Sequence, residues 1–143
     1  MRILFRIIGG SHTIKSYSKL TPSKLSTIID RIKSILTEAK LKLPRLVARY
    51  AKEMDVPYEK VFVKAQKTRW GSCSSKGNIN LNCLLMKVPS YVRKYVIVHE
   101  LAHRKEMNHS ERFWRVVAEE IPEYQKALKW LKKKGDALIG RLP

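Results

Sequence analysis

The sequence predicts an α+β fold, in which several helices surround a small antiparallel sheet. Two observations lead to this prediction. Apolar residues recur with helical spacing in several segments, and two short apolar segments near the middle of the chain flank a Ser-Lys-Gly-Asn turn. A length of 143 residues suits one domain with a core of its own. We therefore expect residues 1–143 to form a single domain.

Turn and capping residues define the first elements. Within residues 1–20, a short hairpin is expected, with strands at 2–8 and 11–17. Thr21 is a suitable N-cap for the helix that follows, and Pro22 suits its first position. This helix has a core-facing stripe of apolar residues, which are Leu25, Ile28, Ile29, Ile32, Ile35 and Leu36.

The middle of the chain is predicted to contain a second helix and a hairpin. Pro44 is expected to open that helix, which runs to about residue 54. Residues 61–70 and 79–85 are expected to be strands joined by a turn at Lys76-Gly77. This hairpin would come immediately before the next helix.

The remainder of the chain is predicted to be helical. Pro89 is expected to begin a helix that runs through His103. A further helix covers residues 110–120, and Pro122 interrupts it. A last helix is expected to end at Gly135, because glycine is common just beyond helix C-termini.

The segment from His99 to His109 contains three of the four histidines and a complete H-E-x-x-H signature. On a helix, residues i and i+4 share one face, so His99 and His103 can bind one metal ion. Catalytic zinc uses three protein ligands and one open position. We therefore predict one zinc ion per chain, bound by His99, His103 and His109, with Glu100 as the general base.

The third ligand requires a break in the helix. If the helix continued, His109 would lie about 15 Å along the axis from His99, which is beyond the reach of an imidazole. The helix must therefore end soon after His103. Asn108 is the expected turn residue, because asparagine tolerates left-handed geometry and caps helices. With Glu111 it would form a capping box that opens the next helix.

Other zinc ligands stay open at this point. A thermolysin-like His₂Glu site would keep His99 and His103 and take a carboxylate from Glu119, Glu120 or Glu123. Cys73 and Cys83 could also bind zinc, but their spacing matches no C-x-x-C pattern, and we expect both to be reduced thiols. A hydrolase also needs a group that stabilises the oxyanion, and Arg69 and Tyr124 are candidate substrate or transition-state contacts.

The net charge of +18 is the second informative feature. Residues 60–99 contain eight Lys or Arg residues and no acid. Such a field attracts polyanions, so nucleic acid is a candidate partner, beside the alternative of a solvated basic surface. No segment has the apolar length of a membrane helix, and the apolar residues 1–8 are too short for a signal peptide. We expect a cytoplasmic protein with no membrane partner.

Four short motifs resemble one known family. They are Thr68-Arg69-Trp70-Gly71-Ser72-Cys73-Ser74, Ile79-Asn80-Leu81-Asn82, Val98-His99-Glu100-Leu101-Ala102-His103, and Asn108-His109-Ser110 with Phe113-Trp114. In combination they resemble the YgjP-like zinc metallopeptidases, most strongly over residues 44–131. The resemblance implies a zincin-like domain related to the SprT-like proteases, with the three histidines as ligands and Glu100 as base. Members of that family usually carry a longer β-rich amino-terminal portion.

The resulting hypothesis is a zinc-dependent metallopeptidase-like hydrolase that acts on peptides. A metal-dependent nucleotide pyrophosphatase of the UTP type is an alternative, because that activity has also been ascribed to members of the resembled family. A nucleic-acid-associated zinc module is a third. The sequence favours an enzyme, because a purely structural zinc site has no need of Glu100 and normally closes its fourth position.

Overall fold

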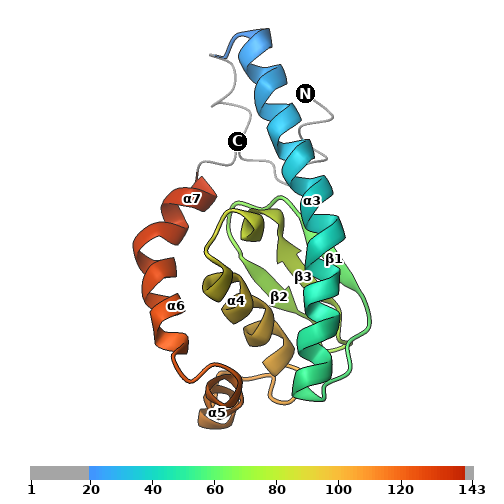
Figure 1. The fold of residues 1–143 in the computed structure, drawn as a ribbon, viewed down its shortest axis with the longest axis vertical. Helices are drawn as coiled ribbons and strands as arrows, with labels where there is room; N and C mark the ends of the chain where they lie inside the picture. The colour runs from blue at the N-terminus through green and yellow to red at the C-terminus, as the bar shows by residue number, and fades with distance from the viewer. Residues whose placement is uncertain (1–19, 141–143) are drawn as a thin grey trace.

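The computed structural model describes residues 20–140 (Figure 1). Helices pack against a three-stranded sheet, so the predicted α+β class is confirmed. The hairpin expected within residues 1–20 lies outside the described residues, apart from the last position. None of the described helices is long and apolar enough to cross a membrane.

The long helix α3 (Pro22–Met54) begins where the sequence predicts, because Thr21 Oγ1 accepts a hydrogen bond from the backbone N–H of Lys24 at 3.4 Å. The prediction of a separate helix from Pro44 is wrong, since Pro44 lies inside α3. A proline in a helix interior costs about 3 kcal/mol. Packing of a continuous buried stripe outweighs this cost. The stripe comprises Ile32, Ala39, Leu43, Val47, Ala51 and Met54.

The sheet contains β1 (Val61–Lys64), β2 (Gly71–Cys73) and β3 (Ile79–Asn82), in the order β1-β3-β2. β2 and β3 form the predicted antiparallel hairpin, but β1 pairs parallel to β3. The sheet is therefore mixed, where an antiparallel one was expected. The strand predicted over residues 61–70 is two strands, β1 and β2, joined by a loop.

Asn82 explains why this loop forms and why β3 ends. Its side chain is buried, and Nδ2 donates to the carbonyl oxygens of Gln66 at 2.7 Å and Arg69 at 2.9 Å. Its Oδ1 accepts from the backbone N–H of Leu84 at 3.0 Å and so caps the 3₁₀ helix η1 (Cys83–Met86). The strand predicted over residues 79–85 therefore ends at Asn82.

The hairpin turn lies one residue earlier than predicted. The backbone N–H of Gly77 donates to the carbonyl oxygen of Ser74 at 2.9 Å, which puts Ser75 and Lys76 at the centre of the turn. Gly77 follows with φ of 91°, a left-handed conformation that favours glycine. This hairpin leads through η1 to the helix that carries the histidines.

The carboxy-terminal helices begin with α4 (Ser90–Ala102), which packs on α3 and the sheet, and the others follow on the side of α4 away from α3. The others are α5 (Glu111–Glu120), α6 (Tyr124–Trp130), the π-helical turn η2 (Leu131–Gly135) and α7 (Asp136–Gly140). The prediction that the last helix ends at Gly135 is wrong, because α7 follows directly. Gly135 is buried, and a β-carbon there would lie 3.3 Å from Trp70 Nε1, so its small size lets η2 pack closely against that indole.

Helix α4 lies at the centre of the domain. It packs against α3, β2, β3, α5 and α6, as its central place in Figure 1 shows. The core comes from all these elements and includes Leu43, Val47, Ile79, Leu81, Val92, Val98, Leu101, Phe113 and Val117. Cys73 and Cys83 are both free thiols, as expected.

Candidate metal centre

The end of α4 positions the first two histidines. His99 lies in its last turn and His103 is its C-cap, with ring centroids 5.1 Å apart. The chain then turns tightly: the backbone N–H of Arg104 donates to the carbonyl of Leu101, and that of Lys105 to Ala102. The predicted break after His103 is therefore confirmed.

The return of the chain to His109 differs in detail from the prediction. Among the described non-glycine residues, positive φ occurs at Asp55 alone, so Asn108 does not adopt left-handed geometry. The N-cap of α5 is Ser110, whose Oγ accepts from the backbone N–H of Phe113 at 3.4 Å. The capping box expected from Asn108 is wrong, because serine caps a helix as well as asparagine does. His109 consequently precedes α5.

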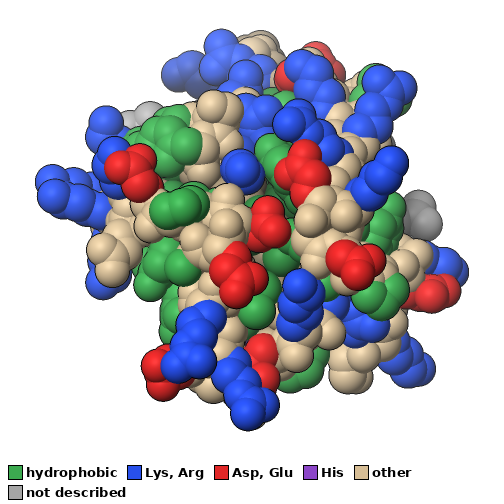
Figure 2. Space-filling model, turned by 60° about the horizontal axis from the view of Figure 1, so that its bottom comes forward, with side chains coloured by type: hydrophobic (Ala, Val, Ile, Leu, Met, Phe, Trp, Pro, Cys, Tyr) green, Lys and Arg blue, Asp and Glu red, His purple; other side chains and the backbone are tan. Residues whose placement is uncertain are grey.

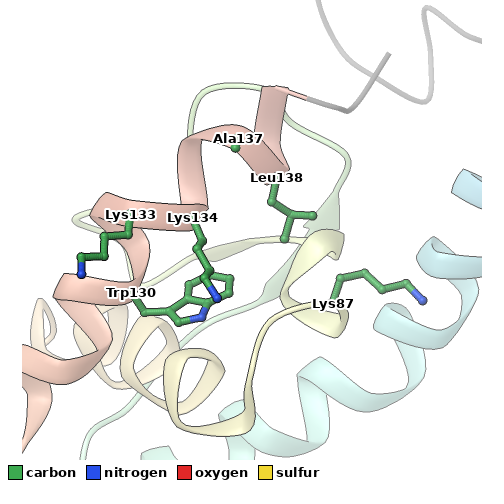
Figure 3. Close-up of a pocket in the computed structure, with 6 residues that line it drawn as sticks. All are labelled: Lys87, Trp130, Lys133, Lys134, Ala137 and Leu138. Atoms are coloured by element: carbon green, nitrogen blue, oxygen red, sulfur yellow. The ribbon is translucent and has the colours of Figure 1, made fainter.

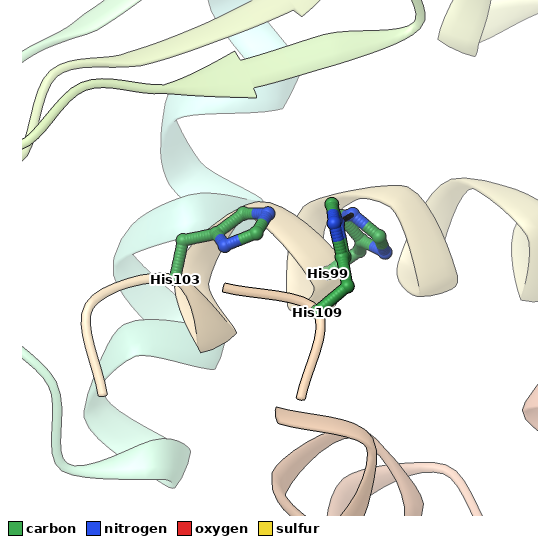
Figure 4. A group of neighbouring side chains, drawn as sticks. All are labelled: His99, His103 and His109. Carbon is green, nitrogen blue, oxygen red and sulfur yellow. Dashed lines mark hydrogen bonds between the residues drawn. The ribbon is translucent and has the colours of Figure 1, made fainter. Parts of the chain in front are cut away.

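The three histidines converge (Figure 4). Their ligand nitrogens all lie within 4.8 Å of one another, and the Nε2 atoms of His99 and His109 are 3.1 Å apart. Two nitrogens bound to one tetrahedral zinc at about 2.0–2.1 Å lie about 3.3 Å apart, so this spacing fits a shared ion. Within residues 20–140, the carboxylates at Glu119, Glu120 and Glu123 do not join this group.

Hydrogen bonds orient two of the imidazoles. His99 Nδ1 lies 3.1 Å from Tyr95 Oη, and His103 Nδ1 donates to the carbonyl oxygen of Glu106 at 3.2 Å. Because a carbonyl only accepts, His103 carries its proton on Nδ1 and its Nε2 is available to a metal. Sequence reasoning missed both partners. Tyr95 could have been found, since it precedes His99 by one helical turn on the same face.

Aromatic rings pack against the histidine rings. The Phe113 ring lies 4.6 Å from that of His103 and 4.8 Å from that of His99, centroid to centroid. Tyr124 stacks on Trp114 at 5.4 Å and does not line the pocket that contains the histidines. The structure thus places this candidate transition-state contact in the packing behind the site.

A pocket of about 300 Å³ opens in front of the triad. Its walls come from β2, the preceding loop, the end of α4 and the turn after it, and its residues are Arg69, Gly71, Ser72, Cys73, His99, Glu100, His103, Met107 and His109. Arg69, the other candidate contact, therefore reaches the site. The backbone of Arg69 is held by Asn82, which fixes this edge of the pocket.

Glu100 is the buried acid of the site, with 7% of its surface exposed. Burial raises its pKa to about 8, and the positive charge of Arg69 opposes that rise. A carboxyl group with a pKa in this range can both accept and release a proton near neutral pH. Burial therefore makes this carboxyl group much more basic than an exposed glutamate.

Two of the histidines, His99 and His103, have the opposite pKa shift. Burial lowers the pKa of His99 to about 4, and the nearby His103 and His109 add to the effect. Burial also lowers the pKa of His103. Both imidazoles are therefore neutral at physiological pH, which is the form that binds metals. Together with His109 beside an open pocket, these two imidazoles suit a zinc ion.

Comparisons with known proteins agree with this geometry. The family model for the YgjP-like metallopeptidase domain matches residues 9–134. Two crystal structures of metallopeptidase zymogens are similar in fold, each with a TM-score of 0.56. Abylysin from Pyrococcus abyssi is 23% identical, and the match covers 63% of this chain and 92% of that one. Jannalysin from Methanocaldococcus jannaschii is 21% identical, with 64% and 96% covered.

None of the curated proteins compared with the sequence matches it. The two crystal structures are too distant in sequence to show more than a shared fold. The family match is broader, because it extends over most of the chain and includes the H-E-x-x-H helix and all three histidines. The chain belongs to the YgjP-like metallopeptidase domain family.

Proposed function

We propose that this protein is a zinc-dependent peptidase, in which His99, His103 and His109 bind one zinc ion and Glu100 is the general base. The observation that carries the proposal is a buried carboxyl group directly beside a histidine triad at an open pocket. A structural zinc site normally closes its fourth position with another protein ligand. The combination of triad, pocket and buried acid is typical of a hydrolase.

The chain's own groups divide the work of hydrolysis. Zinc bound to the triad would supply a Lewis acid and lower the pKa of water in the pocket. Glu100, which packs against the backbone of Gly71, accepts the proton of the attacking water and returns it to the leaving nitrogen. Arg69 contributes positive charge on the pocket wall, where the oxyanion develops.

The position of β2 supports a peptide substrate. β2 pairs with β3 on one side and forms an edge of the sheet, while its residues line the pocket. An extended peptide can add to such an edge through backbone hydrogen bonds. This would bring a substrate peptide bond next to the triad and Glu100. A nucleotide has no comparable use for a strand edge.

Glu100→Gln tests the proposed base. The variant should keep one zinc per chain. Its rate of peptide cleavage should fall about 100- to 10,000-fold, because general base catalysis is removed. Cleavage is measured by mass spectrometry on a peptide mixture, in parallel with pyrophosphate release from UTP. If the wild-type protein releases pyrophosphate from UTP and cleaves no peptide, the peptidase proposal is overturned and the nucleotide alternative is supported. Salt-dependent nucleic-acid binding with no turnover of either substrate would support the zinc module.

The ligand set is tested separately by metal analysis. His109→Ala should lose zinc, while Glu123→Ala should keep one zinc per chain and serves as the control for the rival carboxylate. Glu123 pairs with Lys126 at 2.9 Å on the surface, so its loss leaves the site intact. Full zinc affinity in His109→Ala would show that the third ligand is assigned wrongly.

A further inference from the structure

A second pocket of about 300 Å³ lies at the other end of α4 (Figure 3). It is lined by Lys87, Trp130, Lys133, Lys134, Ala137 and Leu138, with no acidic residue among them, and we name it the Trp130 pocket. Lys87 lies just before α4 begins, whereas the histidines lie at its end. At 1.5 Å per residue, the length of α4 separates the two pockets by about 14–20 Å.

Two of the three lysines of this pocket, Lys133 and Lys134, lie on a turn that packs against the core. η2 carries Lys132, Lys133 and Lys134 in succession and ends at the buried Gly135, which packs against the Trp70 indole. π-Helical turns are rare and occur frequently at functional sites. The turn therefore presents its positive charges from a fixed backbone.

None of these lysines forms an ion pair in the described part of the chain, although the charge of Lys87 adds to the lowering of the Glu38 pKa by Lys42. The ion pairs within residues 20–140 use Lys42, Arg49, Arg115 and Lys126 as their cations. Lys87, Lys133 and Lys134 are absent from them and are exposed. Like charges that share one pocket repel one another, and an anionic ligand would relieve that repulsion.

Trp130 adds a flat aromatic surface. Its indole is half-buried at the end of α6, and Figure 3 shows it beneath the η2 turn and beside Lys134, with Leu138 above. Lys87 lies across from the indole, and its side chain extends away from it. Lys133 points outward from the turn, on the side away from Lys87. An aromatic ring beside basic side chains is the arrangement that proteins use to stack a nucleobase and hold its phosphate.

We propose that the Trp130 pocket binds a nucleotide unit, with the base stacked on Trp130 and the phosphate bound by Lys134 and by Lys87, whose exposed side chain can turn toward the pocket. The unit can belong to single-stranded nucleic acid or to a free nucleotide. Because the pocket lies away from the triad, binding does not compete with a peptide in the catalytic pocket. The proposal therefore stands apart from the proposed peptidase function and goes beyond it.

The test must separate this pocket from the general basic charge. Figure 2 shows Lys and Arg side chains spread around the outline of one face, so any polyanion is attracted to some degree. Lys87→Ala/Lys134→Ala is compared with Lys40→Ala/Lys52→Ala, which removes the same charge from exposed positions on α3. Binding of a fluorescein-labelled ten-nucleotide oligo-dT is measured by anisotropy over a range of NaCl concentrations.

The pocket variant should reduce the slope of log K against log [salt] by about 1.4, because each lost phosphate contact on a single strand contributes about 0.7. The α3 control should keep the slope of the wild type. Equal losses in the two variants would overturn the proposal, because the binding would then follow net charge alone. Absence of binding to the wild type would overturn it as well.

Stacking is tested with Trp130→Leu and Trp130→Phe. Trp130→Leu should weaken oligo-dT binding about 5- to 100-fold, with a smaller loss in Trp130→Phe, because phenylalanine still stacks. An abasic oligomer of the same length should bind weakly and respond to neither change. Equal binding of the two oligomers would overturn the stacked base. Circular dichroism checks folding, and the lysine pair keeps the test valid if Trp130→Leu unfolds.

Competition with dTMP identifies the source of the nucleotide. If dTMP displaces labelled oligo-dT at about the same concentration as unlabelled oligo-dT does, the ligand is a free nucleotide. Displacement only at far higher concentration supports a single strand. If the pocket variant binds both oligo-dT and dTMP as tightly as the wild type does, the proposed site is overturned.

Discussion

A β-carbon on Gly71 would lie 2.9 Å from Cγ of Glu100, closer than side chains pack. It would also lie 3.1 Å from the carbonyl oxygen of Asn80, which belongs to the neighbouring strand β3 and cannot move independently. The glycine of β2 therefore makes the space that the Glu100 carboxyl group occupies. Sheet and helix meet at this point, and the strand fixes the position of the proposed base.

Gly71→Ala should displace Glu100 while the histidines stay in place. We expect peptide cleavage to fall about 100-fold or more, since a shift of about 1 Å in a catalytic group has that effect. Zinc content should stay at one per chain. Turnover and metal analysis on the same preparation check this prediction.

Gly77→Ala is the matched control in the same hairpin. Gly77 has φ of 91°, and a β-carbon there would meet the Arg104 guanidinium at 2.9 Å, so the variant strains the turn. We expect a loss of about 1–2 kcal/mol in the free energy of unfolding, with most of the zinc-loaded activity kept. Equal loss of activity in both variants would show that hairpin stability matters and not the place of Glu100.

Tyr95→Phe removes one hydroxyl group and little else. Tyr95 Oη is the partner of His99 Nδ1 at 3.1 Å, so its loss leaves that imidazole free to rotate. We expect zinc affinity to fall about 10- to 100-fold, as for other partners of metal-binding histidines. Competition with a chromophoric chelator measures it. An unchanged Kd would mean that ring packing alone orients His99.

The sequence predicts the part of the site that depends on how far apart two residues of one chain can lie. The spacing of His99, His103 and His109 leaves one way to join them, a helix that ends after His103, and the structure contains that break. The residue that caps the next helix was not determined by the same argument. Asn108 and Ser110 are both good caps, and only packing of α5 decides between them.

Features that depend on tertiary contacts could not be predicted from the sequence. Pro44 has the local signature of a helix start, but buried neighbours on both sides carry the helix through it. Gly135 has the signature of a helix stop, but its role is to fit against Trp70. The parallel pairing of β1 and β3 has no local signal, because it depends on the loop that Asn82 holds.

Asn82→Ala tests that role of the asparagine. The change removes the donors to the Gln66 and Arg69 carbonyls and the cap on the Leu84 N–H, and we expect a loss of about 1–3 kcal/mol in the free energy of unfolding. Asn78→Ala is the control, because Asn78 Oδ1 is buried without a partner. It should cost far less. Urea unfolding of both variants gives the comparison, and equal losses would contradict the role of Asn82.

The buried acid makes the stability of the metal-free protein depend on pH. The pKa of Glu100 rises from 4.5 to about 8 on folding, so the folded state holds this proton more tightly than the unfolded state does. The corresponding stability is complete below about pH 4.5 and is lost as the pH rises to 8. At about 1.4 kcal/mol per pH unit, the loss can reach about 4 kcal/mol.

Glu100→Gln separates this effect from that of the histidines. The lowered pKa values of His99 and His103 stabilise the fold above about pH 6.5, and that contribution is lost as the pH falls toward 4, the opposite direction. These terms are present in both proteins and cancel in a difference. In the presence of EDTA, the variant should therefore gain stability relative to the wild type between pH 5 and pH 8, as measured by urea unfolding. A difference that stays constant over this range would show that Glu100 is already ionised at pH 5, in contact with the charge of Arg69.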